Sequence, residues 1–161
     1  MKAAFFSEGQ LIFSGDGSLT VTANGKAGIT SDNYVVVQDG VTLNVTSKGG
    51  HGIRGSEMVT ISGGTVNVNT SATGKKGIST DGEFSLSDGA VTITSTSSAG
   101  TVDGELTGAA GIKADESFII DGGSLNVNVS GKGCKGIACD GDGHFNGGTV
   151  KVIASGANYG S

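Results

Sequence analysis

The chain has 161 residues and a formal net charge of −5, with 31 glycines and no proline. This length suits one domain, the acidic balance disfavours nucleic acid as a partner, and no apolar run approaches the roughly 20 residues of a membrane helix. Glycine does not occupy every third position, which excludes collagen. The glycines stand at regular intervals between runs rich in Val, Ile and Thr, a pattern typical of a β-solenoid.

The N-terminal segment is too short for a secretory signal. Only four apolar residues, Ala3–Phe6, follow the initial Met-Lys, whereas a signal needs an apolar stretch of about 7–15 residues. The chain is therefore either cytosolic or a mature fragment without its signal. The composition favours the second alternative, so we expect an extracellular or cell-surface location.

A Gly-Ile pair marks a repeat of about 25 residues. The pair recurs with spacings of 24, 25, 34 and 25 residues, starting at Gly28, Gly52, Gly77, Gly111 and Gly136. A second glycine landmark, before Val- or Leu-containing runs, has nearly the same period: Gly17, Gly40, Gly64, Gly89, Gly123 and Gly148. The one long spacing predicts an inserted surface loop over Ser97–Ala110, which is rich in Ser, Thr, Gly and Ala.

Each repeat contains up to three short β runs. The first opens at the Gly-Ile pair, and the second precedes a glycine turn, as in Tyr34–Val37 and Phe118–Ile120. The third follows the turn and alternates apolar residues with Thr or Asn, as in Val41–Val45 and Leu125–Val129. Such alternation places Val, Leu and Ile on one face of a strand and Thr or Asn on the other.

A three-stranded unit of this length predicts one coil of a parallel β-helix, which is right-handed by default. We expect an all-β, single-stranded β-solenoid of about six coils over residues 1–161. Its glycines should make the sharp turns, because glycine accepts a positive φ. One inner ladder is expected from Ile29, Ile53, Ile78, Ile112 and Ile137.

The end of the chain, Gly156–Ser161, looks like the opening of another inserted loop. This favours a fragment of a longer solenoid, with an exposed C-terminal coil edge and a tendency to associate end to end.

Two cysteines, Cys134 and Cys139, are five residues apart. This is not zinc-finger spacing, and a disulfide would need a turn that brings the Cα atoms within about 7 Å. The simpler interpretation is two small thiols buried in adjacent layers of the core.

Equivalent positions of successive coils stack into columns, and one column is acidic. It holds Asp32, Ser56, Asp81, Asp115 and Asp140. The carboxylates of Asp115 and Asp140 should lie about 5 Å apart, where like charges repel unless a cation or a base intervenes. One interpretation is a Ca²⁺ site formed by Asp115, Asp140 and Asp142 with turn carbonyls. The alternative is that Lys113 and Lys135 neutralise these carboxylates, or that each Asp side chain caps the turn in which it lies.

Cationic residues stand beside the acidic column. They either follow the isoleucine of a Gly-Ile pair or precede it by two residues, and they are Arg54, Lys76, Lys113 and Lys135. These four are candidate ligand-binding residues, because cations suit acidic sugars such as polyuronates. Arg54 lies between the layers of Asp32 and Asp81, so a structural ion pair is its simplest role, and a catalytic base or substrate clamp is the alternative.

The third strands expose a face rich in Thr and Asn. The expected outward pairs are Thr20/Thr22, Thr42/Asn44, Asn67/Asn69, Thr92/Thr94, Asn126/Asn128 and Lys151/Ile153. These residues suit a solvated sheet that is stabilised by stacked Asn side chains. The functional alternatives are a polysaccharide-binding face or an ice-binding array, and Lys151 and Ile153 interrupt the latter.

Four of the repeats have a Gly-Ile-x-x-Asp motif, which Lys precedes in Lys76–Gly82 and Lys135–Gly141 and Ala in Ala110–Asp115. A Gly-Gly-Thr-Val-x-Val motif follows, as in Gly64–Val68. In these motifs, over roughly Gly15–Ser155, the chain resembles bacterial carbohydrate-binding β-helix proteins that are similar to polysaccharide lyases such as pectate lyases. The resemblance implies a secreted or surface-anchored right-handed β-helix, often calcium-dependent, that binds polysaccharides such as cellulose or pectin. It does not imply lyase activity.

The residue pattern favours binding over catalysis. It contains no Ser-His-Asp, Cys-His or phosphate-loop arrangement, although Arg54, Lys76 and Lys113 with the acidic column could supply the parts of a lyase. We therefore expect a non-catalytic polysaccharide-binding module. The alternative is an ice-binding, adhesive or self-assembling structural solenoid. With no Trp and two Tyr, sugar binding would rely on hydrogen bonds and charge.

Overall fold

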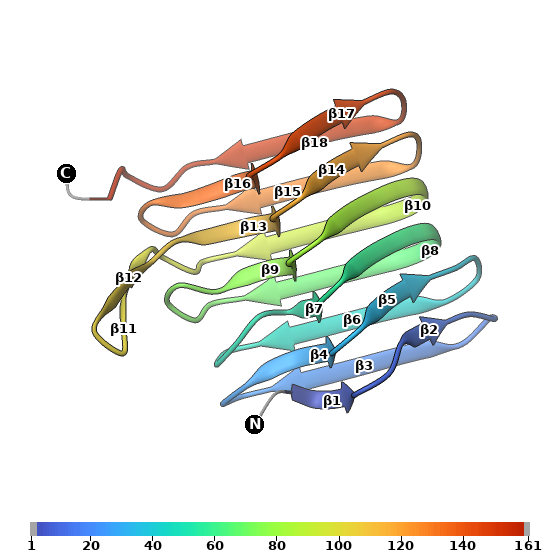
Figure 1. The fold of residues 1–161 in the computed structure, drawn as a ribbon, viewed down its shortest axis with the longest axis horizontal. Coiled ribbons are helices and arrows are strands. Elements are labelled where there is room, and N and C mark those ends of the chain that lie inside the picture. Colours follow the sequence, from blue (N-terminus) through green and yellow to red (C-terminus); the bar gives the residue numbers. More distant parts are fainter. Residues whose placement is uncertain (1–2, 160–161) are drawn as a thin grey trace.

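Each coil has three extended segments, and equivalent segments of successive coils pair in parallel to build a β-solenoid of about six turns (Figure 1). In the third and fourth coils the second and third segments are continuous, as β8 and β10. The structure, a computed structural model, describes residues 3–159. The first two residues and the last two, which belong to the expected terminal loop, lie outside the described part. Among residues 3–159 no helix is long and apolar enough to cross a membrane.

The coils produce three stacks of strands, which we call a, b and c. Stack a contains β1 (Ala3–Ser7), β4 (Ala27–Ser31), β7 (Ile53–Gly55), β9 (Lys76–Thr80), β13 (Ala109–Ala114) and β16 (Cys134–Cys139). Stack b contains β2 (Leu11–Phe13), β5 (Tyr34–Val37), the first halves of β8 (Met58–Thr70) and β10 (Glu83–Ser95), β14 (Ser117–Ile120) and β17 (Asp142–Phe145). Stack c contains β3 (Ser18–Ala23), β6 (Thr42–Ser47), the second halves of β8 and β10, β15 (Ser124–Val129) and β18 (Thr149–Ala154).

A single apolar core fills the space between the stacks. The predicted isoleucine ladder is confirmed in register, and its first four members are fully buried. Ile137 is only partly buried, because the last coil has a neighbouring layer on one side alone. In stack b the rings of Phe84 and Phe118 stack at a centroid distance of 5.3 Å. Ladders of this kind let a chain with few apolar residues keep a continuous core.

The two glycine columns have different functions. The glycines of the turn between stacks b and c have φ values between +72° and +92°, as expected for a sharp turn: Gly40, Gly64, Gly89, Gly123 and Gly148. The glycine of the Gly-Ile pair is not a turn residue, which corrects our expectation. A Cβ on Gly77 would lie 2.5 Å from Cγ2 of Ile93 and 2.6 Å from the carbonyl oxygen of Gly111. This glycine is required because stacks a and c approach closely.

The inserted segment over 97–110 contains an antiparallel hairpin, not only an irregular loop. Strands β11 (Gly100–Val102) and β12 (Glu105–Thr107) pair across Asp103 and Gly104, whose φ values are +52° and +86°. Positive φ at both central residues is the requirement of a type I′ turn, for which Asp-Gly is a favoured sequence. The hairpin packs against the turn at Gly74, where an added Cβ would be 2.8 Å from the Thr107 side chain.

The cysteines lie in one layer, not in adjacent layers as expected. Cys134 and Cys139 are the two ends of β16, and both are free thiols. Five residues of extended strand separate them by about 17 Å, because a strand rises about 3.3 Å per residue. Burial raises the pKa of the Cys134 thiol.

The register of stack c differs from the expected one in the second coil. The outward neighbours of Thr20 and Thr22 are Asn44 and Thr46, whereas Thr42 pairs with Ser18. The predicted pair Thr42/Asn44 is therefore wrong by two residues. Our sequence analysis aligned Gly17 with Gly40, whereas Ser18 pairs with Thr42 and the positive-φ glycine of the first coil is Gly15.

Candidate functional site

The outward side chains of stack a form two columns, one on each side of the Gly-Ile pair. The glycine and the isoleucine both face the interior, so the residue before the pair and the residue after it face outward. The first column contains Ala27, His51, Lys76, Ala110 and Lys135. The second column contains Thr30, Arg54, Ser79, Lys113 and Ala138. Small and long side chains alternate along the second column and are mixed in the first.

A hollow of about 150 Å³ opens between the two columns in the last three coils. It is lined by Lys76, Gly108, Ala109, Ala110, Lys113, Lys135 and Ala138, and we call it the lysine groove. Ala110 is the register partner of both Lys76 and Lys135, so the two long side chains stand on either side of a buried alanine. Three of the four predicted ligand-binding residues are thus brought together. The hairpin segment supplies Gly108 at one side.

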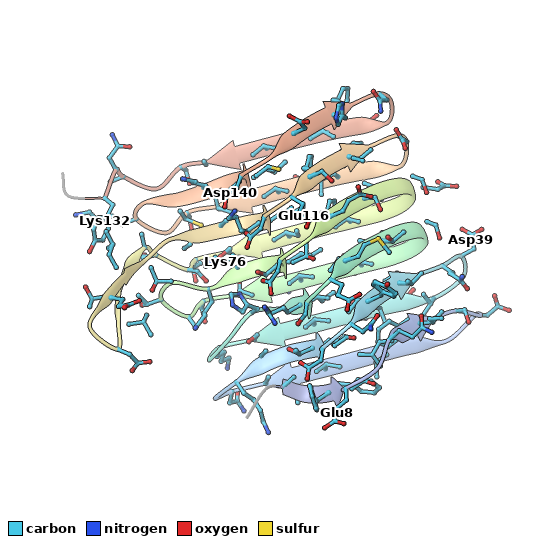
Figure 2. The ribbon with its side chains drawn as sticks, in the orientation of Figure 1. Glu8, Asp39, Lys76, Glu116, Lys132 and Asp140 are labelled. Atoms are coloured by element: carbon cyan, nitrogen blue, oxygen red, sulfur yellow. The ribbon has the colours of Figure 1, made fainter. Side chains whose placement is uncertain are left out.

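Lys113 joins the groove to the acidic column. Its ammonium donates to Oδ1 of Asp115 at 2.8 Å and to Oδ2 of Asp140 at 2.6 Å. Partial burial alone would lower the pKa of Lys113, but the hydrogen bonds to the two carboxylates outweigh it and raise this pKa above its ordinary value. Figure 2 labels Lys76 and Asp140, which lie at opposite ends of their strands in stack a: Lys76 begins β9, and Asp140 follows β16. The interpretation that a lysine neutralises the stacked carboxylates is confirmed for Lys113.

The same contacts bear on the predicted calcium site. Lys113 already occupies the space between the carboxylates of Asp115 and Asp140, while Asp142 begins the exposed strand β17. Residues 3–159 contain no group of three or more His, Cys, Asp or Glu side chains that could hold a metal ion. The arrangement fits an ion pair better than a Ca²⁺ site, which normally has six to eight oxygen ligands. Calcium binding stays a prediction.

A neutral histidine supports the cationic side of the groove. His51 Nδ1 accepts a hydrogen bond from the backbone N–H of Lys76 at 3.1 Å. Burial, together with the positive charges of Lys76, Lys75 and Arg54, lowers the pKa of His51 to about 3. Burial also lowers the pKa of Lys76, whose ammonium donates to the carbonyl of Gly74 at 3.2 Å. Our sequence analysis assigned no role to His51.

Arg54 lies outside the lysine groove. Its guanidinium pairs with the Asp81 carboxylate at 2.5 Å and donates to Oγ of Ser56 at 2.8 Å. The interpretation of Arg54 as a structural ion-pair residue is confirmed. The guanidinium thereby links the third and fourth coils.

A second, larger hollow of about 520 Å³ lies at the turn between stacks a and b. It is lined by Tyr34, Ser56, Glu57, Met58, Asp81, Gly82, Glu83 and Glu116, and we call it the acidic hollow. A hydrogen bond with Glu57, and the charge of that carboxylate, raise the pKa of the Tyr34 hydroxyl. Its four carboxylates would repel an anionic ligand. Sequence analysis missed this hollow because its acidic residues do not share one repeat position.

One comparison with known proteins identifies the family of the chain. One family model, described as "Carbohydrate-binding domain-containing protein", matches residues 1–97 and again residues 70–158. No curated protein and no solved structure matches the chain. The two matches overlap and together extend over nearly all of the 161 residues. The chain therefore belongs to this family of carbohydrate-binding domain proteins.

Proposed function

We propose that the protein is a non-catalytic module that binds an acidic, pectin-like polysaccharide in the lysine groove. The observation that supports this function is the group of three lysines around an alanine floor, Lys76, Lys113 and Lys135. A narrow cationic groove with a small-residue floor suits the carboxylate of a uronate, since an ammonium gives a charge-assisted hydrogen bond. Among the described residues, Lys135 has no carboxylate within salt-bridge distance, so its charge is available to a ligand.

The geometry favours a ligand that runs along the solenoid. Lys76 and Lys135 belong to layers on either side of Ala110, so they are two layers, or about 10 Å, apart along the rod. One hydrogen bond to a charged group contributes about 1.5–3 kcal/mol. A polysaccharide that contacts several coils would add such contacts, whereas a single sugar would contact only one or two.

Lys113 does not suit the role of a lyase base. A lyase needs a base that is neutral when it abstracts the proton next to the uronate carboxylate. Lys113 is held in its charged form by Asp115 and Asp140. We also propose an extracellular or cell-surface location, because pectin-like polysaccharides occur outside cells.

Retention on insoluble polysaccharide tests the proposed function. The wild-type chain should be retained by a polygalacturonate gel more strongly than by cellulose. Retention should decrease steeply as the salt concentration rises, because salt screens the lysine charges. Lys135→Ala should weaken binding about tenfold, as expected for one charge-assisted contact. Lys151→Ala is the matched control, because Lys151 is an exposed lysine of the same coil on stack c. Parallel runs with calcium and with chelator test the calcium prediction.

Two results would contradict the proposal. The first is equal retention of the wild-type chain, Lys135→Ala and Lys151→Ala. The second is the release of unsaturated uronates from polygalacturonate, detected by ultraviolet absorbance, which would show a lyase.

A further inference from the structure

A third hollow, of about 220 Å³, lies at the carboxyl ends of the stack c strands, and we call it the hydroxyl hollow. Its side chains come from β6, β8 and β10 and from the corners that follow these strands. Four threonines, two serines, one asparagine and one lysine line it. In contrast to the acidic hollow, none of the described residues that line it has a carboxylate.

Two columns of outward residues form the walls of the hydroxyl hollow. In the first column Asn69 pairs in register with Thr46 on one side and with Thr94 on the other. The second column stands two residues further along each coil, at the corner. Its backbone N–H groups donate to carbonyls of the preceding coils at 2.8, 3.3 and 2.9 Å, so its members also lie in register: Lys48, Ser71 and Thr96. The two columns are therefore about 7 Å apart and follow the rod over three layers.

The floor between the columns is fixed by hydrogen bonds within the chain. Ser47 and Thr70 lie there, and both are buried. The Ser47 hydroxyl donates to the carbonyl of Lys26 at 2.8 Å, and the Thr70 hydroxyl donates to Oγ of Ser95 at 3.0 Å. These two hydroxyls therefore stabilise the fold and are not available to a ligand.

The first wall, by contrast, has unpaired polar groups. Within residues 3–159 the hydroxyls of Thr46 and Thr94 and the amide of Asn69 make no hydrogen bond to the protein. In the neighbouring outward column of stack c, the amides of Asn44 and Asn67 bond to each other at 3.0 Å. The paired column stabilises the sheet, whereas the unpaired column beside the hollow can donate to a ligand and accept from it.

The chemistry of this lining suits a sugar without charge. A threonine hydroxyl and an asparagine amide can each both donate and accept, which matches the hydroxyl groups of a sugar ring. The threonine methyl groups can contact the C–H groups of the same ring. Lys48 is the one charged residue among the described residues of the lining, and it stands at one end. The hollow therefore has no group of charges that would select an ionic ligand.

The hydroxyl hollow and the lysine groove lie on opposite faces of the rod. A Cβ on Gly77 of stack a would be 2.5 Å from Cγ2 of Ile93 in stack c, so the inward faces of these stacks touch. Their outward faces therefore point away from each other. One straight polysaccharide segment cannot occupy both sites, so each site is available to a different chain.

We propose that the hydroxyl hollow binds an uncharged polysaccharide and that the protein thereby links it to the acidic polysaccharide in the lysine groove. The second site stands on the geometry of stack c alone, whereas the link rests on the proposed function. A small module with two sites on opposite faces joins two kinds of polysaccharide without a second domain.

Retention on insoluble uncharged polysaccharides tests the second site, with cellulose, mannan and chitin as probes. At least one of them should retain the wild-type chain, and added salt should hardly change this retention because no group of charges takes part. Thr94→Val removes one hydroxyl and keeps the shape of the side chain, so binding should weaken about threefold. The double variant Asn69→Ala/Thr94→Val should weaken it about tenfold.

Thr92→Val is the matched control for the second site. Thr92 is an exposed outward threonine of the same strand, two residues before Thr94, and it does not line the hollow. This variant should be retained like the wild-type chain. Equal thermal melting of the three variants and the wild-type chain, followed by circular dichroism, shows that a loss of retention is not a loss of fold.

A capture experiment tests the link. Wild-type protein held on the uncharged solid should capture soluble polygalacturonate from solution. Lys135→Ala should stay on the solid and capture about tenfold less, as for one charge-assisted contact. The double variant Asn69→Ala/Thr94→Val should leave the solid and still be retained by a polygalacturonate gel.

The outcomes separate the second site from the proposed function. Retention on none of the three solids, or equal retention of the double variant and Thr92→Val, overturns the second site. A steep loss of retention in salt, or on Lys48→Ala, means that the hollow binds an anion and overturns it too. Retention without capture overturns the link. If a polygalacturonate gel then also fails to retain the protein, the proposed function has failed while the second site stands.

Discussion

The outward faces of stacks a and c differ more than their inward faces do. Stack a buries an isoleucine ladder beside a column of glycines, and stack c buries ladders of Val, Leu and Ile. Outward, stack c presents columns dominated by Thr, Asn and Ser, whereas stack a mixes alanines with His, Lys and Arg. The uneven face of stack a carries the lysine groove, whereas the hydroxyl hollow of about 220 Å³ lies at the carboxyl ends of the stack c strands, beside Thr46, Asn69 and Thr94. The lysine groove therefore depends on residues that vary between coils, not on the repeat itself.

The cause of the difference is the Gly-Ile pair. In stack c inward and outward residues alternate strictly, so neighbouring outward columns are two residues apart. In stack a two consecutive residues face inward, so the outward columns are three residues apart. That is about 10 Å instead of about 7 Å along the strand, which leaves room for a groove.

Acid should affect stack a most strongly. The pKa of His51 is about 3 in the folded chain, against an ordinary histidine value of 6.5, so the unfolded chain takes up the proton first as the pH falls. Stability should therefore decrease between about pH 6.5 and pH 3, by on the order of 4 kcal/mol. Urea unfolding at pH 7 and pH 4 measures this. His51→Asn should lose less stability over that interval than the wild-type chain.

His144→Asn is the control for acid sensitivity, because His144 is an exposed histidine of β17. This variant should lose as much stability in acid as the wild-type chain. An acid response of His51→Asn equal to that of wild type would show that other groups cause it.

Filling the glycine of stack a should have the next largest effect. Gly77→Ala places a Cβ within 2.6 Å of Ile93 and of the Gly111 carbonyl, so the stacks must separate. Overpacking of this kind costs about 1–3 kcal/mol. In Gly108→Ala the new Cβ meets no atom within 4 Å, and the free energy of unfolding should hardly change. Equal stability of the two variants would refute the close approach of stacks a and c.

Loss of an asparagine side chain from the outward column of stack c should reduce stability least. Asn67 Nδ2 donates to Oδ1 of Asn44 at 3.0 Å. Asn67→Ala should reduce the free energy of unfolding by about 0.5–1.5 kcal/mol, which is the usual contribution of one hydrogen bond. Asn126→Ala, in the same column but at an exposed position, should cost less. A larger loss in Asn126→Ala would argue against stabilisation by the Asn44–Asn67 contact.

The fold could be predicted because the sequence motifs that specify it recur at a regular spacing. The Gly-Ile pair and the alternating third strand repeat often enough to fix the coil length, and the isoleucine ladder follows from equal spacing. The reason for the Gly-Ile glycine could not be predicted, because its close neighbour Ile93 belongs to another stack. Local propensity suggested a turn, and tertiary packing placed the glycine inside a strand.

The site was predictable only where it follows the repeat. Lys76, Lys113 and Lys135 stand at repeat positions, and the structure brings them together. The acidic hollow was missed because Glu57 and Glu83 occupy different positions of their coils. The hairpin had a signal, Asp103-Gly104 between two short β runs, which our sequence analysis did not use.

The hairpin of β11 and β12 shows how this architecture tolerates change. The coil that contains it is 34 residues long instead of 25, yet the strands before and after it pair in the ordinary register. A corner of the solenoid therefore accepts nine additional residues at no cost to the ladders. Mutation can lengthen, shorten or replace such corners independently of the core, so the wall of a binding surface can diversify faster than the rod that carries it. Laboratory grafting of other hairpins at this corner would use the same freedom.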